Sequence, residues 1–236
     1  MKAADVPMPT TEKAPRGARR KRDTRARLLG AALHLMADRG VAGVTINEIT
    51  EQADVGFGSF YNHFASKDVI HAALIEEVIG HFAVALDKLG EQLSDPAEKI
   101  AASARYTMLR GRADPLWGRF VFQTSFSRDS MTTGLGKYLL QDIGKGVSSG
   151  RFTVADLPSV YIAVGSTILG ALAAVSDAGR PGPEAAPDLF GDETTLSERI
   201  AAILLTVLGL STEEAQDIAR RPLPHIELPA NPFAQT

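Results

Sequence analysis

Two helix starts lie close together near the N-terminus and restrict what the chain between them can form. Thr45 and Glu48 make a T-x-x-E capping box, in which the two residues satisfy each other's backbone amides at the start of a helix. Asp54 ends this helix early, and Ser66 is a good N-cap for a longer helix that follows. Positions 56–63 leave room for one short helix. The spacing therefore predicts a short helix, a turn, a second short helix and then a long one.

The rest of the chain carries the same kind of signal. Apolar residues at helical spacing predict a helix from about Asp23 to Gly40, and another from Lys67 through Leu89. We find no internal repeat and no convincing strand, so the predicted fold class is all-α. Further helices are predicted within 96–112, 115–126, 134–150, 156–176 and 195–210, with a last small one after Ser211.

Charge is distributed unevenly along the 236 residues. Residues 1–70 contain 11 Lys and Arg against 8 Asp and Glu, whereas the remaining residues contain 14 against 20. Seven cations between Arg16 and Arg27 are opposed only by Asp23. This basic arm indicates a polyanionic partner at one end of the protein, although a merely solvated arm is an equal alternative. Cysteine is absent, which fits a reducing cytoplasm, and the polar N-terminus lacks the apolar core of a secretion signal.

The predicted helix, three-residue turn and short helix have the geometry of a helix-turn-helix. The segment TINEITEQADVGFGSFYNHFASKDVI, residues 45–70, resembles the DNA-binding signature of the TetR family of transcriptional regulators. The resemblance covers residues 24–71 by motif spacing, and beyond them only the number and order of helices. It implies an all-α chain, with an N-terminal three-helix helix-turn-helix DNA-binding domain followed by a helical ligand-binding and dimerisation domain.

We accordingly divide the chain into four parts. Residues 1–21 are expected to be a disordered basic arm, and residues 22–70 the helix-turn-helix DNA-binding domain. Residues 71–221 would form the helical ligand-binding and dimerisation domain, and residues 222–236 a flexible tail. The expected function is a ligand-released repressor that binds a palindromic operator as a homodimer. Activation in place of repression stays open, as does a helical small-molecule carrier or enzyme that uses the C-terminal pocket.

The second short helix has the composition of a DNA-reading element. Small residues on its leading face permit close approach to base edges, and Phe57 suits contact with a thymine methyl group. By the resemblance, an aromatic, a histidine and a lysine further along, together with Thr45, hold phosphates and fix register. The family most often has glycine where Asp54 lies, but aspartate tolerates the left-handed conformation. The expected DNA-binding residues are Arg25, Thr45, Gly56, Phe57, Gly58, Ser59, Tyr61, His63 and Lys67.

Aromatic residues are dense in the middle of the chain, where a pocket for a small apolar or amphipathic effector is expected. Such pockets are lined mainly by apolar side chains with few polar groups. For any single aromatic residue, a place in the core is the better interpretation. The expected pocket residues are Phe82, Tyr106, Met108, Trp117, Phe120, Phe122 and Phe126.

Residues 157–176 carry no charge before Asp177, which suits either a membrane span or a helix buried between subunits. Pro158, the small residues and the lack of a basic flank favour the interpretation as a subunit contact, so no membrane partner is expected. The expected interface pairs this helix with the one at 196–210. Its residues are Ile162, Gly165, Ile168, Gly170, Leu172, Ile203 and Val207.

Short motifs that would indicate catalysis or metal binding occur without the neighbouring elements or residues that such sites need. GVSSG at 146–150 matches a nucleophile elbow, but a predicted helix precedes it and the only later histidine is His225. The five histidines form no zinc-binding spacing, although a composite site with carboxylates stays open. We therefore expect no catalytic residues, no metal site and no cofactor, and a cytoplasmic protein whose partner is double-stranded operator DNA.

Overall fold

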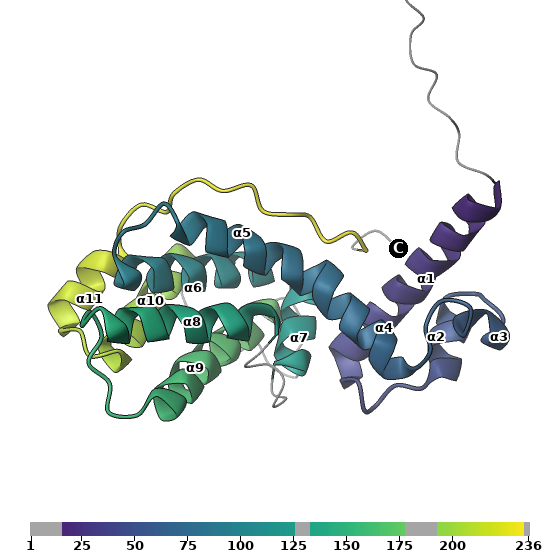
Figure 1. Ribbon diagram of the computed structural model, residues 1–236, viewed down its shortest axis with the longest axis horizontal. Helices are drawn as coiled ribbons and strands as arrows, with labels where there is room; N and C mark the ends of the chain where they lie inside the picture. Colours follow the sequence, from purple (N-terminus) through teal and green to yellow (C-terminus); the bar gives the residue numbers. More distant parts are fainter. Residues whose placement is uncertain (1–15, 126–132, 178–192, 234–236) are drawn as a thin grey trace, which may run out of the picture.

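A computed structural model of the chain describes residues 16–125, 133–177 and 193–233. Every regular element in these residues is a helix, as predicted. The molecule has two parts, a small N-terminal head and a larger helical body, which Figure 1 shows at its two ends. One long helical rod leaves the head and runs along the body.

In the described residues, the head is built from one long helix of 24 residues and three short ones of 7, 4 and 8 residues. Thr45 caps the second of them as predicted, because its hydroxyl accepts from the Glu48 amide while the Glu48 carboxylate accepts from the Thr45 amide. Phe60 and Phe64 are buried and join the helices through one core. The helices are α1 (Arg16–Arg39), α2 (Ile46–Gln52), α3 (Phe57–Phe60) and α4 (Lys67–Leu74).

Two backbone features define the ends of these helices. Gly40, at a φ of 67°, ends α1 where the sequence predicts a stop. Asp54 adopts a φ of 51° in the turn between α2 and α3, which confirms the left-handed turn expected of this residue. The prediction of a disordered arm up to residue 21 is wrong for residues 16–21, which form the first turns of α1. Residues 17–22 are exposed, and the arginine, lysine and alanine among them have high helix propensity, which favours continuation of the helix.

The long rod consists of three continuous elements. After α4 come one π-helical segment, η1 (Ile75–Gly80), and α5 (His81–Gly90). Residues in helical conformation flank η1 on both sides, so the chain passes from the head into the body without a break. The sequence predicts one helix here, and the wider π turn within it is the difference.

Within the residues that the structure describes, the body contains six more helices. Asp95 and Asp114 cap the first two through side-chain hydrogen bonds, and Pro96 and Pro115 lie at their starts. Two apolar clusters form the cores, one of which continues into the head. The helices are α6 (Pro96–Ala113), α7 (Pro115–Thr124), α8 (Gly134–Ser148), α9 (Leu157–Asp177), α10 (Glu193–Val207) and α11 (Thr212–Ala219).

The predicted flexible tail is an extended strap over residues 222–233. Arg105 and Arg110 of α6 donate hydrogen bonds to the carbonyls of Arg221 and Pro229, at 2.6 and 2.7 Å. Phe233 is buried in the core cluster that continues into the head. Figure 1 shows this strap passing along α5 toward the head. The polar residues and prolines of this segment predicted a flexible tail. Its hydrogen-bond partners lie more than a hundred residues earlier in the chain, so no local pattern indicated them.

Candidate DNA interface and ligand cavity

The surface formed by α2, α3 and the start of α4 carries exposed aromatic and small residues side by side. Phe57 and Tyr61 are 51% and 52% exposed, and their rings meet edge to face at 5.7 Å. Gly56 and Gly58 are also exposed, and a Cβ at Gly58 would meet nothing within 4 Å. Large exposed aromatics are unusual on a solvated surface, so the arrangement fits a surface that another molecule covers.

Lys67 lies beside the start of α2. Its ammonium group donates to the Val44 carbonyl at 2.7 Å, one residue before the Thr45 cap. The Thr45 hydroxyl donates to Glu48 Oε2 at 2.7 Å, and Arg39 pairs with Glu48 Oε1 at 2.7 Å. These bonds hold the pKa of Glu48 down, to about 2. The Thr45 hydroxyl proton is therefore already engaged, whereas Lys67 has two further N–H groups.

His63 borders the basic end of α1. Burial lowers its pKa below the ordinary value, and the charges of Lys21 and Arg25 lower it further. Arg25 itself pairs with Glu77 of η1 at 2.6 Å and lies over the Phe64 ring. Arg25 thus ties the head to the long rod, a contact that the sequence did not indicate. Its expected contact with DNA requires that this ion pair be shared or broken.

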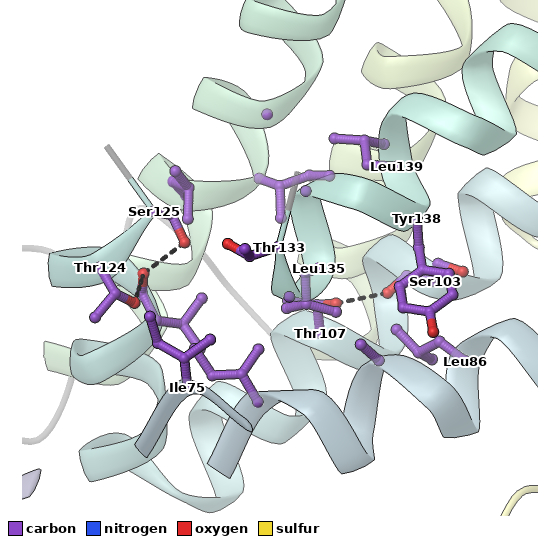
Figure 2. Close-up of a pocket in the computed structure, with 18 of the residues that line it drawn as sticks. Ile75, Leu86, Ser103, Thr107, Thr124, Ser125, Thr133, Leu135, Tyr138 and Leu139 are labelled. Atoms are coloured by element: carbon purple, nitrogen blue, oxygen red, sulfur yellow. Dashed lines mark hydrogen bonds between the residues drawn. The ribbon is translucent and has the colours of Figure 1, made fainter. Parts of the chain in front are cut away.

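A cavity of about 690 Å³ lies inside the body, bounded by the rod, α6, α7, α8 and α9. Apolar residues from all five elements line it, as Figure 2 shows for Ile75, Leu86, Leu135 and Leu139. Its polar lining includes hydroxyl groups and the carboxylates of Asp68, Asp87 and Asp142. The volume and the largely apolar walls are those of a site for a small organic ligand.

None of the expected pocket residues that the structure describes lines this cavity. Phe82, Met108, Trp117 and Phe120 are fully buried in the core beside it. Trp117 donates to the Val78 carbonyl at 3.0 Å and packs edge to face on Phe82. The core interpretation prevails because large rings fill space well and leave no void.

The two remaining described members also lie elsewhere. The Tyr106 hydroxyl donates to the Pro224 carbonyl of the strap, and Phe122 is half-buried outside the lining. Phe126 lies outside the described residues. Smaller residues on α6 and α8, such as Ser103, Thr107 and Leu139, form the walls, and only the position of these helices could have indicated them.

Apolar residues remain exposed along α9 and α10. Ile162, Ile203 and Val207 are 62%, 51% and 39% exposed, and Gly170 also faces outward with open space around it. Leu172, which we expected at the same surface, is instead fully buried within its own chain. It lies on the opposite side of α9, where a Cβ on Gly111 would come within 2.1 Å of it.

Two apolar helical stretches, one of them in α9, could be considered as membrane spans. Lys67–Gly90 and Leu157–Ser176 are long and apolar enough to cross a membrane, judged by length and composition. That evidence is weak, because core helices of soluble proteins meet the same criteria. Gly165 and Ile168 of the expected interface are half-buried and line the cavity, as Ile162 does, so this part of α9 forms a cavity wall.

Two family descriptions match the chain. Residues 28–74 match "Bacterial regulatory proteins, tetR family", and residues 95–221 match "Tetracyclin repressor-like, C-terminal domain". The chain is 37% identical over 71 residues to the transcriptional repressor NemR of Escherichia coli strain K12, and 30% identical over 124 residues to the regulator TcmR of Streptomyces glaucescens. These alignments cover 30% and 50% of this chain, and 34% and 54% of those relatives.

Solved structures extend the likeness over most of the chain. The crystal structure of RolR in complex with resorcinol is 33% identical, with a TM-score of 0.63, and covers 89% of this chain and 100% of that one. FadR from Bacillus subtilis in complex with stearoyl-CoA has a TM-score of 0.58 at 19% identity, over 78% of this chain and 98% of that one. The second likeness concerns the fold alone.

Proposed function

Because the chain belongs to the TetR family of transcriptional regulators, we propose that it is a repressor that binds a palindromic operator as a dimer and is released by a small effector. The observation that carries this proposal is the continuous rod Lys67–Gly90. Its first residue lies at the DNA-facing surface of the head. Farther along, Ile75, Ile79 and Leu86 of the same rod line the cavity. A ligand that moves the rod therefore also moves the head.

The proposed reading head uses α3 against base edges and its flanks against phosphates. Gly56, Gly58 and Ser59 let the backbone approach the major groove, and Phe57 is available for a thymine methyl group. Tyr61, His63 and Lys67 would hold phosphates. Thr45 would join them only if its hydroxyl or amide left Glu48, which now accepts from both. The exposure of Phe57 and Tyr61 supports this arrangement. Residues 22–70, extended by the earlier turns of α1, form the proposed DNA-binding domain.

The proposed dimer brings α9 and α10 of two chains together. Ile203 and Val207 are exposed on α10, which supports this dimer, since such side chains lose contact with water when a second copy covers them. Gly170 faces outward on α9 with open space around it, so a partner helix can approach closely there. Two heads related by a two-fold axis would recognise two half-sites of a pseudo-palindromic duplex. Residues 71–221 form the proposed ligand-binding and dimerisation domain.

The proposed effector is a small apolar or amphipathic molecule that enters the cavity. RolR, which is similar over nearly the whole chain, was crystallised with resorcinol, a small aromatic compound with two hydroxyl groups. Release requires that the effector prefer one arrangement of the two heads, since equal affinity for both arrangements would shift nothing. Relatives such as NemR are named repressors, which supports repression as the action of this protein. NemR comes from a bacterium, so we place this protein in a bacterial cytoplasm.

Genome-wide recovery of bound DNA tests the proposal most broadly. Fragments recovered with the protein should share one pseudo-palindromic sequence, and purified protein should bind that duplex selectively. Deleting the gene should raise transcription next to the site if the protein represses. Recovery of no shared sequence would contradict the operator proposal, and lowered transcription after deletion would make the protein an activator.

A further inference from the structure

The charged residues that line the cavity are acidic in the described part of the chain. Three aspartates, Asp68, Asp87 and Asp142, belong to its lining, whereas no Lys or Arg among the described residues does. Burial lowers the pKa of the lining residue His71, which favours its neutral ring. A ligand that carried a carboxylate or phosphate would thus be desolvated without a cation to pair with, which is costly.

Several lining hydroxyl groups have already used their protons. Thr107 donates to the Ser103 carbonyl at 2.8 Å, and Ser125 donates to the Val121 carbonyl at 2.7 Å, as the dashed lines in Figure 2 show. Thr124 likewise donates to the Phe120 carbonyl at 2.8 Å. A hydroxyl has one proton and two lone pairs. Facing the cavity, these three groups therefore act as acceptors.

The carboxylates at the α5 and α8 side share one cation. Lys99 Nζ lies 2.9 Å from Asp142 Oδ1 and 3.3 Å from Asp87 Oδ1. Lys99 is not itself a lining residue, and it passes so close to Gly90 that a Cβ there would lie 1.9 Å from Lys99 Cε. The Asp142 side chain is only 7% exposed. One ammonium cannot occupy all the lone pairs of two carboxylates, so acceptor positions remain.

Other lining groups do not reverse this balance. Hydroxyl groups such as those of Ser103, Tyr138 and Ser166 are neutral and can donate as well as accept. The buried His71 Nε2 has no hydrogen-bond partner in the described part of the chain, and in a neutral ring that atom accepts in one tautomer and donates in the other. The strongest polar groups in the cavity remain the two paired carboxylates.

We propose that the cavity selects effectors by their hydrogen-bond donors: an apolar body whose hydroxyl or protonated amine reaches Asp87 and Asp142, with carboxylates and phosphates rejected. This proposal rests on the proposed function only in taking the cavity as the effector site. It narrows the ligand class to phenols, alcohols and amines. A buried carboxylate accepting from such a group forms a charge-assisted bond, which is stronger than a neutral one.

Three probes with one apolar body test the selection. 4-Hexylresorcinol carries two donors, its dimethyl ether keeps the shape without donors, and 4-hexylbenzoate is anionic. Calorimetric titration of the full chain, without DNA, should show 4-hexylresorcinol binding at least about tenfold more tightly than the other two. Equal or tighter binding of the ether or the benzoate would overturn the proposal, and so would failure of all three to bind.

Variants then locate the selection. Asp142→Asn should reduce the preference for 4-hexylresorcinol over its ether to about threefold or less, because a neutral amide is a weaker acceptor. Asp217→Asn, an exposed aspartate on α11, is the matched control and should leave the preference unchanged. If Asp142→Asn unfolds, the more exposed Asp87→Asn provides the same test. A preference unchanged in the folded variant would overturn the assignment of these carboxylates.

Failure of this inference is distinguishable from failure of the proposed function. Probe selectivity is measured on the protein alone, whereas operator binding and release are measured with DNA. If the protein binds 4-hexylresorcinol selectively but stays on its operator, the selection of donors holds and the proposed ligand release is wrong. If only an anionic molecule that competes for the cavity releases the protein from DNA, the proposed ligand release holds and the selection of donors is wrong.

Discussion

Replacing Lys67 by alanine separates a phosphate contact from a base contact. In the free protein, the Lys67 ammonium donates to the Val44 carbonyl across 2.7 Å at a half-buried position. Losing that bond should cost about 1 kcal/mol of unfolding free energy, and the melting temperature should fall by roughly 2–4 °C. The variant should therefore remain folded at room temperature, so that its DNA binding can be measured.

The effect on DNA follows from counting phosphates. Each neutralised phosphate contributes about 0.9 to the slope of log affinity against log salt. If each subunit of a dimer loses one contact, Lys67→Ala should reduce the magnitude of that slope by about 1.8. Binding to specific and unrelated duplexes should weaken by similar factors. Fluorescence anisotropy between 50 and 300 mM salt, about the range in which such contacts dominate, measures both quantities.

Lys88→Ala is the matched control, since Lys88 is an exposed lysine on α5 within the body. This control should leave slope and selectivity unchanged. An unchanged slope in Lys67→Ala would refute the phosphate contact. Loss of selectivity at constant affinity would mean that Lys67 reads bases.

Three further perturbations test the dimer, the pH response and the turn. A Cβ at Gly170 meets nothing within 4 Å, so Gly170→Glu leaves the single chain undisturbed but buries an unpaired charge in the proposed interface, and sedimentation should show a monomer. Gly144→Glu, equally unobstructed, should remain dimeric, and a dimeric Gly170→Glu protein would place the interface elsewhere. Burial, Lys21 and Arg25 lower the pKa of His63 from its ordinary value, and a bound phosphate would raise it, so operator affinity should be highest at a pH below the His63 pKa of the free protein and should fall as pH rises through the His63 pKa of the complex. An affinity that does not change with pH, or a pH profile that His63→Gln leaves unchanged, would show that His63 does not contact the phosphate. Asp54→Ala should be about 1 kcal/mol less stable to urea than Asp54→Gly, since φ is 51° there, and equal stability would argue against the left-handed turn.

Local signals in the sequence were sufficient for the helices and the turn. The capping box at Thr45, the Ser66 cap and the stop at Gly40 depend on residues a few positions apart, and the structure confirms each. The π turn in η1 has no comparable signal in the sequence. The strap after Arg221 was missed because its hydrogen bonds reach α6 across the whole chain.

The exposed residues around α3 could be predicted from the sequence, whereas the residues that line the cavity depend on packing and could not. Phe57 and Tyr61 are exposed beside the glycines, which leaves them available for the proposed DNA contacts. Trp117 and Phe82 were expected around a ligand, yet they fill the core. A void remains between the rod and helices α6 to α9, and short side chains such as Thr107 are part of its walls. Sequence identifies apolar residues, but it does not show which of them will face a gap.

Direct binding of the wild-type protein to duplex DNA tests the central claim. At low salt the protein should bind a pseudo-palindromic duplex recovered from its own genome, as a dimer with one head on each half-site. Affinity should fall steeply as salt is raised, and scrambling either half-site should weaken binding. A folded dimer that ignores duplex DNA at low salt, or that binds every sequence equally, would contradict the account.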